Sequence, residues 1–302
     1  MKHVFIINPA AGKQDRTAEL SASIRALMGG RGLDYEILVS KQPGDCTKLA
    51  RTAARSGEDC RIYACGGDGT LNEVVCGVAG LANAAVTHFP CGSGNDFIKI
   101  FDDPAAFRSL ERLLDPEEAS FDLIRVGEDY SLNICSIGID ARIGTEIGKY
   151  KRLPLVSGKG AYNLSTVINL AKGIHHHYLV EVDGERIDGR FTLMCVCNGR
   201  FYGGGYQPVP QAEPDDGLLE VLLVGKVSLL QVAGIIGKYK EGRYAEFPQI
   251  IRHFQARRVV IHCDATEVVN LDGEARYAKD VEMSLADLKL RFFYPKGLHY
   301  KR

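Results

Sequence analysis

The sequence contains no uncharged apolar run of the roughly 18 residues that a membrane-spanning helix needs. Its first apolar stretch, HVFIINP, also lacks the length and the cleavage site of a signal peptide. Neither sign of charge forms a long run, and 37 basic residues balance 38 acidic ones to a net charge of −1. These absences predict a cytoplasmic protein with peripheral membrane contacts only, and they disfavour nucleic acid as the main partner.

No C-x-x-C pair occurs among the nine cysteines. An odd number of scattered thiols is typical of buried, reduced cysteines rather than of a disulfide framework or a zinc site. Cys195 and Cys197 alternate along an apolar segment. Because side chains two residues apart in a strand face the same side, we expect both cysteines in the core.

The first third of the chain alternates short apolar runs with helical patterns. Strands are predicted at 3–8, 35–40, 61–65 and 84–89, and helices at 15–28, 45–54 and 71–80. Such alternation indicates βαβ units and a parallel sheet, with ligands at the carboxyl ends of the strands.

After about residue 121 the pattern changes to apolar segments separated by turns. Strands are predicted at 121–126, 130–137, 178–184, 190–198, 217–224, 257–263, 266–274 and 288–294. Helices are predicted at 160–173 and 227–241, and we interpret the three histidines at 175–177 as the solvated end of the first of these. A chain of 302 residues is long enough for two domains. We therefore expect a mostly antiparallel β-domain after an α/β domain.

Three loops rich in small residues follow predicted strands: NPAAGK at 8–13, GGDGT at 66–70 and PCGSGND at 90–96. A glycine-rich turn before a helix presents backbone N–H groups and the positive end of the helix dipole, which suits a phosphate. The sequence lacks both G-x-x-x-x-G-K-[ST] and a strand-linked G-x-G-x-x-G, so the site is neither an ordinary P-loop nor a Rossmann site. The alternative without a ligand is a tight turn with a capping box formed by Thr70 and Glu73.

In this order the three loops resemble the diacylglycerol kinase catalytic-domain family. This family includes bacterial soluble diacylglycerol kinases, YegS-type lipid kinases, and sphingosine and ceramide kinases. The resemblance extends through DDGLLEVLLV at 215–224 and LDGE at 271–274. It implies an α/β domain like those of NAD kinases and phosphofructokinases, with ATP in a cleft facing a C-terminal β-sandwich.

The resemblance also implies a division of the chain by role. Residues 1–122 would form the ATP-binding α/β domain, and residues 123–289 the β-sandwich that takes the lipid. The segment from about 290 to 302 would return to the first domain. The boundary near residue 122 is also where the pattern of the sequence changes.

By resemblance, residues of the three loops and one further serine line the nucleotide. They are Asn8, Pro9, Ala10, Ala11, Gly12, Ser40, Gly66, Gly67, Asp68, Gly69, Thr70, Leu71, Asn72 and Ser93. The family usually has threonine where Ser93 stands, so the hydroxyl is kept and only a packing methyl group is lacking. Asn95 and Asp96 would complete the polar wall, although on their own they also fit a helix cap.

Two acidic motifs in the second half of the chain complete the implied site. Asp216, with main-chain oxygens near Glu213 and Leu218, would hold a structural Mg²⁺, and oxygen-only ligands fit a hard ion. On its own, this segment also fits an acidic turn. Glu274 would accept the proton of the substrate hydroxyl, with Asp272 as its neighbour or substitute, although Asp272-Gly273 is also a turn signal.

The sequence therefore predicts an ATP-dependent lipid kinase that uses Mg²⁺ and meets its lipid substrate at a membrane surface. A NAD kinase-like phosphotransferase shares GGDGT and is one alternative. A nucleotide-binding regulator that has lost catalysis is another. The identity of the lipid and the formation of a homodimer are left open, because no short motif encodes either.

Overall fold

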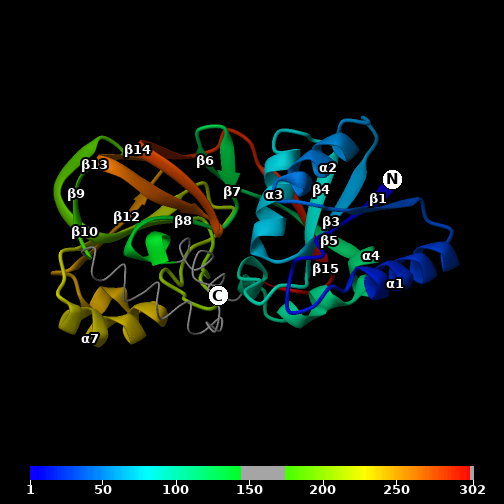
Figure 1. Cartoon of the computed structure of the whole chain (residues 1–302), viewed down its shortest axis with the longest axis horizontal. Helices are drawn as coiled ribbons and strands as arrows, with labels where there is room; N and C mark the ends of the chain where they lie inside the picture. Colours follow the sequence, from blue (N-terminus) through cyan, green and yellow to red (C-terminus); the bar gives the residue numbers. More distant parts are fainter. Residues whose placement is uncertain (144–173, 300–302) are drawn as a thin grey trace. The chain divides into compact units, whose positions relative to one another are not determined.

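A computed structural model describes residues 1–143 and 174–299. The chain forms two compact units: unit 1 comprises Met1–Leu123 and Ala286–Arg302, and unit 2 comprises Ile124–Leu285 (Figure 1). The sequence predicts divisions near residues 122 and 289, and the structure divides the chain after Leu123 and after Leu285. The predicted helix at 160–173 lies outside the described residues.

Unit 1 contains a six-stranded sheet of order β2-β1-β3-β4-β15-β5. Its strands are β1 (Lys2–Ile7), β2 (Tyr35–Val39), β3 (Cys60–Gly66), β4 (Ala84–Pro90), β5 (Pro116–Phe121) and β15 (Leu290–Pro295). β1 to β4 are parallel to their neighbours, and β15 pairs parallel with β4 and antiparallel with β5. All seven residues of β4 are buried, as expected for a strand with helices on both faces of its sheet.

The helices of unit 1 are α1 (Thr17–Gly30), α2 (Asp45–Ala54), α3 (Asp68–Val78) and α4 (Leu110–Leu114), with 3-10 turns η1 (Phe97–Ile100) and η2 (Pro104–Arg108). α2 packs against α3 and α1 contacts α4, and the strands lie between these two pairs (Figure 1). Gly77 permits the close approach of α2, because a Cβ there would lie 2.6 Å from the carbonyl oxygen of Thr47. The α/β class predicted for this part of the chain is confirmed.

The order of strands reverses at the centre of this sheet. From β1 the chain moves outward to β2, whereas from β3 it moves the other way to β4. In open α/β sheets, ligands bind outside the carboxyl ends of the strands at such a reversal. The fold therefore indicates the loops that follow β1 and β3 as the candidate ligand site.

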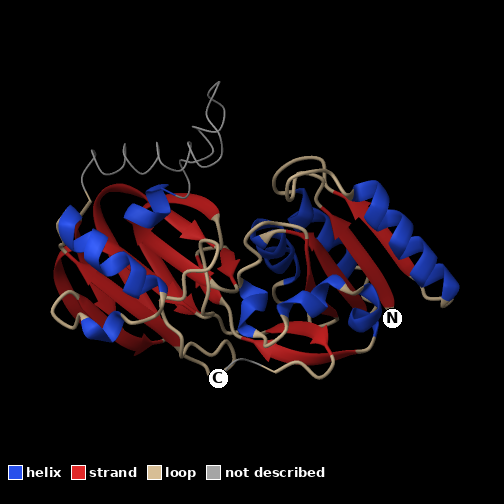
Figure 2. Ribbon diagram, turned by 90° about the horizontal axis from the view of Figure 1, so that it is seen from below, coloured by secondary structure: helices blue, strands red, loops and turns tan. Residues whose placement is uncertain are grey.

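Unit 2 is an antiparallel nine-stranded sheet of order β12-β11-β10-β8-β13-β14-β6-β7, in which β9 pairs with both β10 and β13 (Figure 2). Its strands are β6 (Ile124–Val126), β7 (Asp129–Ser131), β8 (Ile134–Gly138), β9 (His176–Val182), β10 (Glu185–Cys197), β11 (Leu219–Gly225), β12 (Ile251–Ala256), β13 (Arg258–Leu271) and β14 (Glu274–Leu285). The helical parts described in this unit are residues 139–143, α7 (Leu229–Lys240) and the 3-10 turn η3 (Tyr244–Glu246). The predicted antiparallel β-domain is confirmed.

Two apolar clusters lie on opposite faces of β10. Met194 and Val196 belong to one cluster. Cys195 and Cys197 belong to the other, together with Tyr239 of α7. The prediction that both cysteines face one side and are buried is confirmed, and none of the nine cysteines, all of which are described, forms a disulfide.

The three histidines at 175–177 do not end a helix. His176 is the first residue of strand β9, in which every second residue is buried from Tyr178 onward. The ring of His176 contacts the buried carboxylate of Glu267, and the ring of His177 lies 2.6 Å from Asp188. The helix-end interpretation is wrong because His176 and His177 are the first two residues of β9, where they pair with Phe191 and Arg190 of β10. In the described part of the chain, no group of three or more histidine, cysteine or acidic side chains could hold a metal ion.

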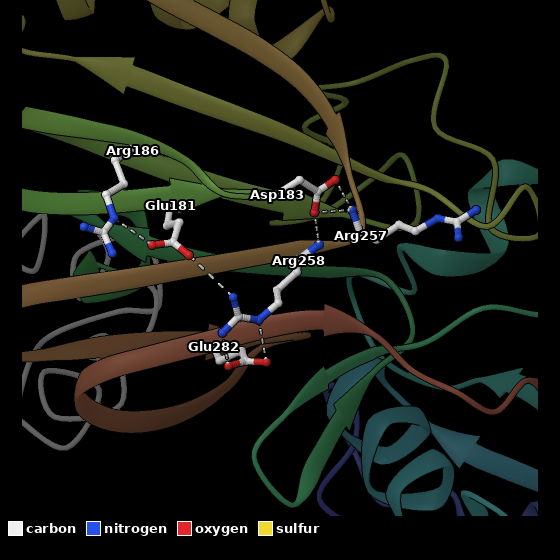
Figure 3. Close-up of polar contacts among 6 residues, drawn as sticks. All are labelled: Glu181, Asp183, Arg186, Arg257, Arg258 and Glu282. Carbon is white, nitrogen blue, oxygen red and sulfur yellow. Dashed lines mark hydrogen bonds and ion pairs between the residues drawn. The ribbon is translucent and has the colours of Figure 1, made fainter.

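A carboxylate and an ion-pair cluster stabilise the β9–β10 turn of unit 2 (Figure 3). Asp183 has a φ of 45°, and its carboxylate accepts hydrogen bonds from the backbone N–H of Arg258 at 2.8 Å and of Arg257 at 3.0 Å. The Arg258 guanidinium pairs with Glu282 through two hydrogen bonds of 3.0 and 2.8 Å, and lies 3.6 Å from Glu181. One aspartate thus joins the turn to the start of β13.

We expect Asp183→Ala to lower the free energy of unfolding by about 1–2 kcal/mol, because two backbone donors lose a charged acceptor. Asp183→Asn keeps one acceptor oxygen and tolerates a positive φ, so its loss should be smaller. Urea unfolding of the three proteins measures both differences. Wild-type stability in Asp183→Ala would show that the carboxylate does not stabilise the turn.

Candidate active site

The loops after β1 and β3 are joined by the side chain of Asn8. Its amide nitrogen donates to the hydroxyl oxygen of Thr70 at 2.9 Å, and its amide oxygen accepts from the backbone N–H of Ala10 at 3.0 Å. The backbone N–H of Asn8 donates to the Cys65 carbonyl at 3.0 Å. Asn8 thus connects the loop at 8–13 to the first turn of α3.

Gly66 connects the loops after β3 and β4. Its carbonyl oxygen accepts hydrogen bonds from the backbone N–H of Cys91 at 2.7 Å and of Gly92 at 3.1 Å, and lies 3.0 Å from Nε2 of His88. A Cβ on Gly92 would lie 2.5 Å from the Cα of Gly67. Glycine is therefore required here by the contact of one loop with the other.

Gly12 shows the same requirement in the first loop. Its φ is +85°, and a Cβ there would lie 2.5 Å from the carbonyl oxygen of Cys91. The structure thus brings the three predicted loops together at the carboxyl ends of β1, β3 and β4. This is the edge at which the order of strands reverses.

Asp68 is the residue that joins α3 to the third loop. One carboxylate oxygen accepts from the backbone N–H of Asn95 at 2.7 Å, and the other from that of Asp96 at 2.5 Å. Burial, and then the nearby Asp96 carboxylate, raise the pKa of Asp68, while His88 opposes the rise. Asp68 therefore orders two loops as well as placing a carboxylate at the site.

The capping-box alternative for GGDGT is wrong. α3 begins at Asp68, its N-cap is Gly67, and no side-chain hydrogen bond caps it. The Glu73 carboxylate accepts instead from the backbone N–H of Gly44 at 2.9 Å and of Cys46 at 3.0 Å, at the start of α2. The partners of Glu73 are thus nearly thirty residues away in the sequence, and a local motif cannot indicate them.

The other residues expected at the nucleotide differ in exposure. Ser40 is buried at the end of β2, where its backbone N–H donates to the Ile7 carbonyl at 3.0 Å. Leu71 and Asn72 are each 3% exposed, so their side chains lie inside the unit. The exposed or half-buried members are Pro9, Ala10, Ala11, Gly12, Gly69 and Ser93.

Asn95 and Asp96 do not cap η1 through their side chains. Asn95 has a φ of 50°, and its amide nitrogen donates to the Gly92 carbonyl at 2.8 Å. The carboxylate of Asp96 forms an ion pair with Lys99. The helix-cap alternative is therefore wrong, and both residues order the third loop.

His88 was not indicated by any motif. It is fully buried in β4, its Nε2 lies 3.0 Å from the Gly66 carbonyl oxygen, and burial lowers its pKa. The only feature of the sequence that could indicate His88 is its position as a single polar ring near the end of an apolar strand, directly before a glycine loop. Because the ring contacts the backbone of GGDGT, we regard it as a positioning residue.

The acidic segment in unit 2 forms a turn before β11. Asp216 is exposed, and its carboxylate accepts from the backbone N–H of Leu218 at 2.9 Å. Gly217 between them has a φ of +77°, and Glu213 is exposed. The turn that the sequence alone suggests is therefore present. Its carboxylate and main-chain carbonyls are the all-oxygen donor set that Mg²⁺ prefers.

Asp272 lies in the turn between β13 and β14, with a φ of 50°. Its carboxylate accepts hydrogen bonds from three consecutive backbone N–H groups, those of Leu132, Asn133 and Ile134, at 2.8 to 3.1 Å. Leu132 and Asn133 lie between β7 and β8, and Ile134 is the first residue of β8, so the predicted strand at 130–137 is interrupted where these donors turn to Asp272. Burial raises the pKa of Asp272, and these hydrogen bonds oppose the rise.

Glu274 is the first residue of β14 and is partly exposed. If Asp272 and Glu274 were in one strand, their carboxylates would face the same side, because residues two apart in a strand do so. The turn places Asp272 outside either strand and directs its carboxylate to the backbone at 132–134. The turn that Asp272-Gly273 signals is therefore present, and the two carboxylates are not in equivalent positions.

Comparison with known proteins agrees with this architecture. The diacylglycerol kinase catalytic domain matches residues 2–126, and the YegS C-terminal NAD kinase beta sandwich-like domain matches residues 133–292. The chain therefore belongs to the diacylglycerol kinase catalytic-domain family. Within that family it has the domain composition of the YegS-like lipid kinases.

Single relatives match most of the length of the chain. The "Probable lipid kinase YegS-like" of Chromohalobacter salexigens is 32% identical over 275 residues, which cover 88% of this chain and 86% of that protein. A crystal structure of a diacylglycerol kinase from Bacillus anthracis str. Sterne has a TM-score of 0.69 at 22% identity, covering 98% of this chain and 97% of that one. A second crystal structure from the same strain has a TM-score of 0.76 at 24% identity, covering 99% and 98%. At these identities the two structures show a common fold.

Proposed function

We propose that this protein is an ATP-dependent lipid kinase, which transfers the γ-phosphate of ATP to a hydroxyl of a membrane lipid such as diacylglycerol. The observation that carries the proposal is the convergence of three glycine-containing loops at the strand-order reversal of unit 1. The family of the chain supports the same activity. The residues given below for each role are part of the proposal.

The nucleotide would bind at the loops after β1 and β3. Gly66–Thr70 leads from β3 into the first turn of α3, where backbone N–H groups and the helix dipole favour a phosphate. Asn8 and Asp68 hold this turn against the other two loops through hydrogen bonds of 2.5 to 2.9 Å. Because the loops are ordered by contacts within the protein, little ordering remains for ATP to induce.

ATP supplies the phosphoryl group, and a Mg²⁺ bound with it offsets the charge of the phosphates. The chain's own contribution to the chemical step is a general base. We assign this role to Glu274, because the Asp272 carboxylate is already used by three backbone N–H groups. A partly exposed glutamate can accept the proton of a hydroxyl that approaches from solvent or from a lipid surface.

The proposed structural Mg²⁺ is separate from the nucleotide. Asp216 and the main-chain oxygens of Glu213 and Leu218 would hold it in the turn before β11, where the Asp216 carboxylate already accepts the Leu218 N–H. One carboxylate with carbonyl oxygens is a suitable donor set for a hard cation. Such an ion would stabilise the turn rather than contact the reacting atoms.

Removal of this metal is expected to lower the melting temperature of the wild-type protein. A ligand that binds only the folded state adds about 2.7 kcal/mol at 100 times its dissociation constant. Asp216→Ala should melt at a lower temperature and should not respond to EDTA. Asp215→Ala, the neighbouring exposed aspartate, is the matched control and should keep the EDTA response. Equal EDTA responses in wild type and Asp216→Ala would contradict the site.

The activity itself is tested by transfer of labelled phosphate from [γ-³²P]ATP. Acceptors are diacylglycerol in detergent micelles, a mixed lipid extract, NAD, and no acceptor. We expect labelled product with a lipid acceptor only. Labelled NADP would indicate a NAD kinase-like enzyme, and ATP binding without any transfer would indicate a nucleotide-binding regulator. Either result would overturn the proposal.

A further inference from the structure

Helix α7 of unit 2 has two apolar faces, of which only one is packed. Val232, Ile235 and Tyr239 follow one another at helical spacing, and Tyr239 belongs to the apolar cluster against which Ile235 packs. Ile235 and Tyr239 therefore form the inward face, and the half-buried Val232 lies at the spacing of the same face. Ser228 caps the helix in a capping box with Gln231, so its N-terminus is well defined.

The second apolar face is open to solvent. Leu230 is 88% exposed, Leu229 is 53% exposed and Ile236 is 43% exposed. Together with the exposed Ala233 they recur at the spacing of one side of a helix. A helix that is apolar on both sides is normally buried, so an exposed apolar stripe indicates an interaction surface.

The charges within the helix and just before it have one sign, and the first acidic residue, the exposed Glu241, follows directly after Lys240. Between Gly225 and Lys240 the charged residues are three lysines, Lys226, Lys238 and Lys240, and there is no acidic residue. Lys226 and Lys240 are exposed at the two ends of the stripe, whereas Lys238 pairs with Glu246 at 2.7 Å. Amphipathic lysine stems place their ammonium groups in water beside an apolar surface.

We propose that α7 is a membrane-docking helix, which inserts Leu229, Leu230 and Ile236 among the acyl chains of an anionic bilayer. Lys226 and Lys240 then lie at the level of the acidic headgroups. An exposed apolar stripe with lysine at both ends is the arrangement of helices that lie in a membrane interface. This surface is distinct from every residue assigned above to nucleotide, metal or base.

The choice of a bilayer as the occupant depends on the charges and on the substrate. A second copy of the same helix would bring lysines against lysines, whereas anionic headgroups complement them. The proposal also rests on the proposed function, because a kinase of bilayer lipids must reach its substrate at a surface. No helix in the described residues has the length and apolar character to cross a membrane.

The test is co-sedimentation of the full chain with vesicles in the absence of ATP and diacylglycerol. Equimolar phosphatidylglycerol and phosphatidylcholine form the anionic vesicles, and phosphatidylcholine alone forms the neutral ones. We expect Leu229→Ser/Leu230→Ser to lower partitioning to anionic vesicles by at least about tenfold. Val39→Ser, which alters an exposed aliphatic side chain of unit 1, should bind as wild type.

The charge contribution is tested by Lys226→Gln/Lys240→Gln. Each lysine removed near an anionic surface should cost about fivefold in partitioning, so the double variant should lose about 25-fold on anionic vesicles and little on neutral ones. Arg25→Gln/Lys48→Gln removes the same charge from exposed positions of unit 1 and is the matched control. In about 1 M NaCl, where screening reduces the range of charge to about 3 Å, the lysine effect should disappear and the leucine effect remain.

Equal vesicle binding by wild type and the leucine variant would overturn the proposal. A wild-type dimer that becomes monomeric in the leucine variant, with vesicle binding unchanged, would overturn it in favour of self-association. Phosphoryl transfer to short-chain diacylglycerol in detergent micelles separates this proposal from the proposed function. Transfer in micelles without vesicle binding refutes the docking helix alone, and vesicle binding without transfer to any lipid refutes the kinase alone.

Discussion

Glu274→Gln is expected to reduce kcat on a lipid acceptor by about 10²–10⁴-fold, because glutamine keeps the size of the side chain but cannot take the hydroxyl proton. The side chain is partly exposed at the start of β14 and lies outside the apolar clusters, so the fold should be unaffected. ATP affinity should stay near the wild-type value, because the nucleotide is expected at loops of unit 1. Steady-state kinetics with saturating diacylglycerol, and separate ATP titration, measure the two quantities.

Asp272→Asn is the necessary control for that experiment. Its carboxylate accepts from the backbone N–H groups of Leu132, Asn133 and Ile134, and an amide would bring an N–H group against another N–H. We therefore expect a lower melting temperature for Asp272→Asn, with its kcat less affected than that of Glu274→Gln. If Glu274→Gln turns over normally while a folded Asp272→Asn is inactive, the base is Asp272. If both turn over normally, LDGE supplies no general base.

The α/β alternation of the first third could be predicted closely, because each element there is specified by local pattern. The helix predicted at 45–54 is α2 (Asp45–Ala54). The strand predicted at 61–65 is one residue shorter than β3 at each end, and the strand predicted at 84–89 is one residue shorter than β4 at its end. Parallel strands with helices on both faces are nearly continuous apolar runs. Such runs stand out from the polar loops that separate them.

Unit 2 could be predicted only as a class of fold. β14 (Glu274–Leu285) was not indicated, because most of its residues are polar and at least partly exposed, so it lacks a clean apolar alternation. β13 (Arg258–Leu271) was predicted as two strands, and the break corresponds to a register shift between His262 and Glu267. These features are determined by pairing with distant strands, which a local window does not contain.

In the candidate site, too, contacts between side chains and distant residues could not be predicted from local sequence. The sequence indicated that the loops at 8–13, 66–70 and 90–96 lie at one sheet edge, because each follows a parallel strand. It did not indicate that Asp68 accepts the backbone N–H groups of Asn95 and Asp96, which are 27 and 28 residues away. Asp68 therefore contributes to the fold as well as to the site, whereas the sequence suggested a contribution mainly to the site.

Asp68→Ala is accordingly expected to lose both activity and stability. Two part-buried backbone N–H groups would lose a charged acceptor, which costs about 1–3 kcal/mol for each donor left unsatisfied. The loops after β3 and β4 would then be joined only by the backbone hydrogen bonds to the Gly66 carbonyl, so ATP affinity and kcat should both fall. Urea unfolding measures the first effect, and ATP titration with kinetics at a temperature where the variant is folded measures the second.

Asp183→Ala is the matched control, because that carboxylate also accepts two backbone N–H groups of another segment, in unit 2. It should lower stability and leave ATP affinity and kcat at wild-type values. Comparison of the two variants therefore separates a general loss of stability from a local loss of loop order. If a folded Asp68→Ala binds ATP and turns over as wild type does, the nucleotide is not held at GGDGT. If both variants lose activity in proportion to their stability, Asp68 has no role specific to the site.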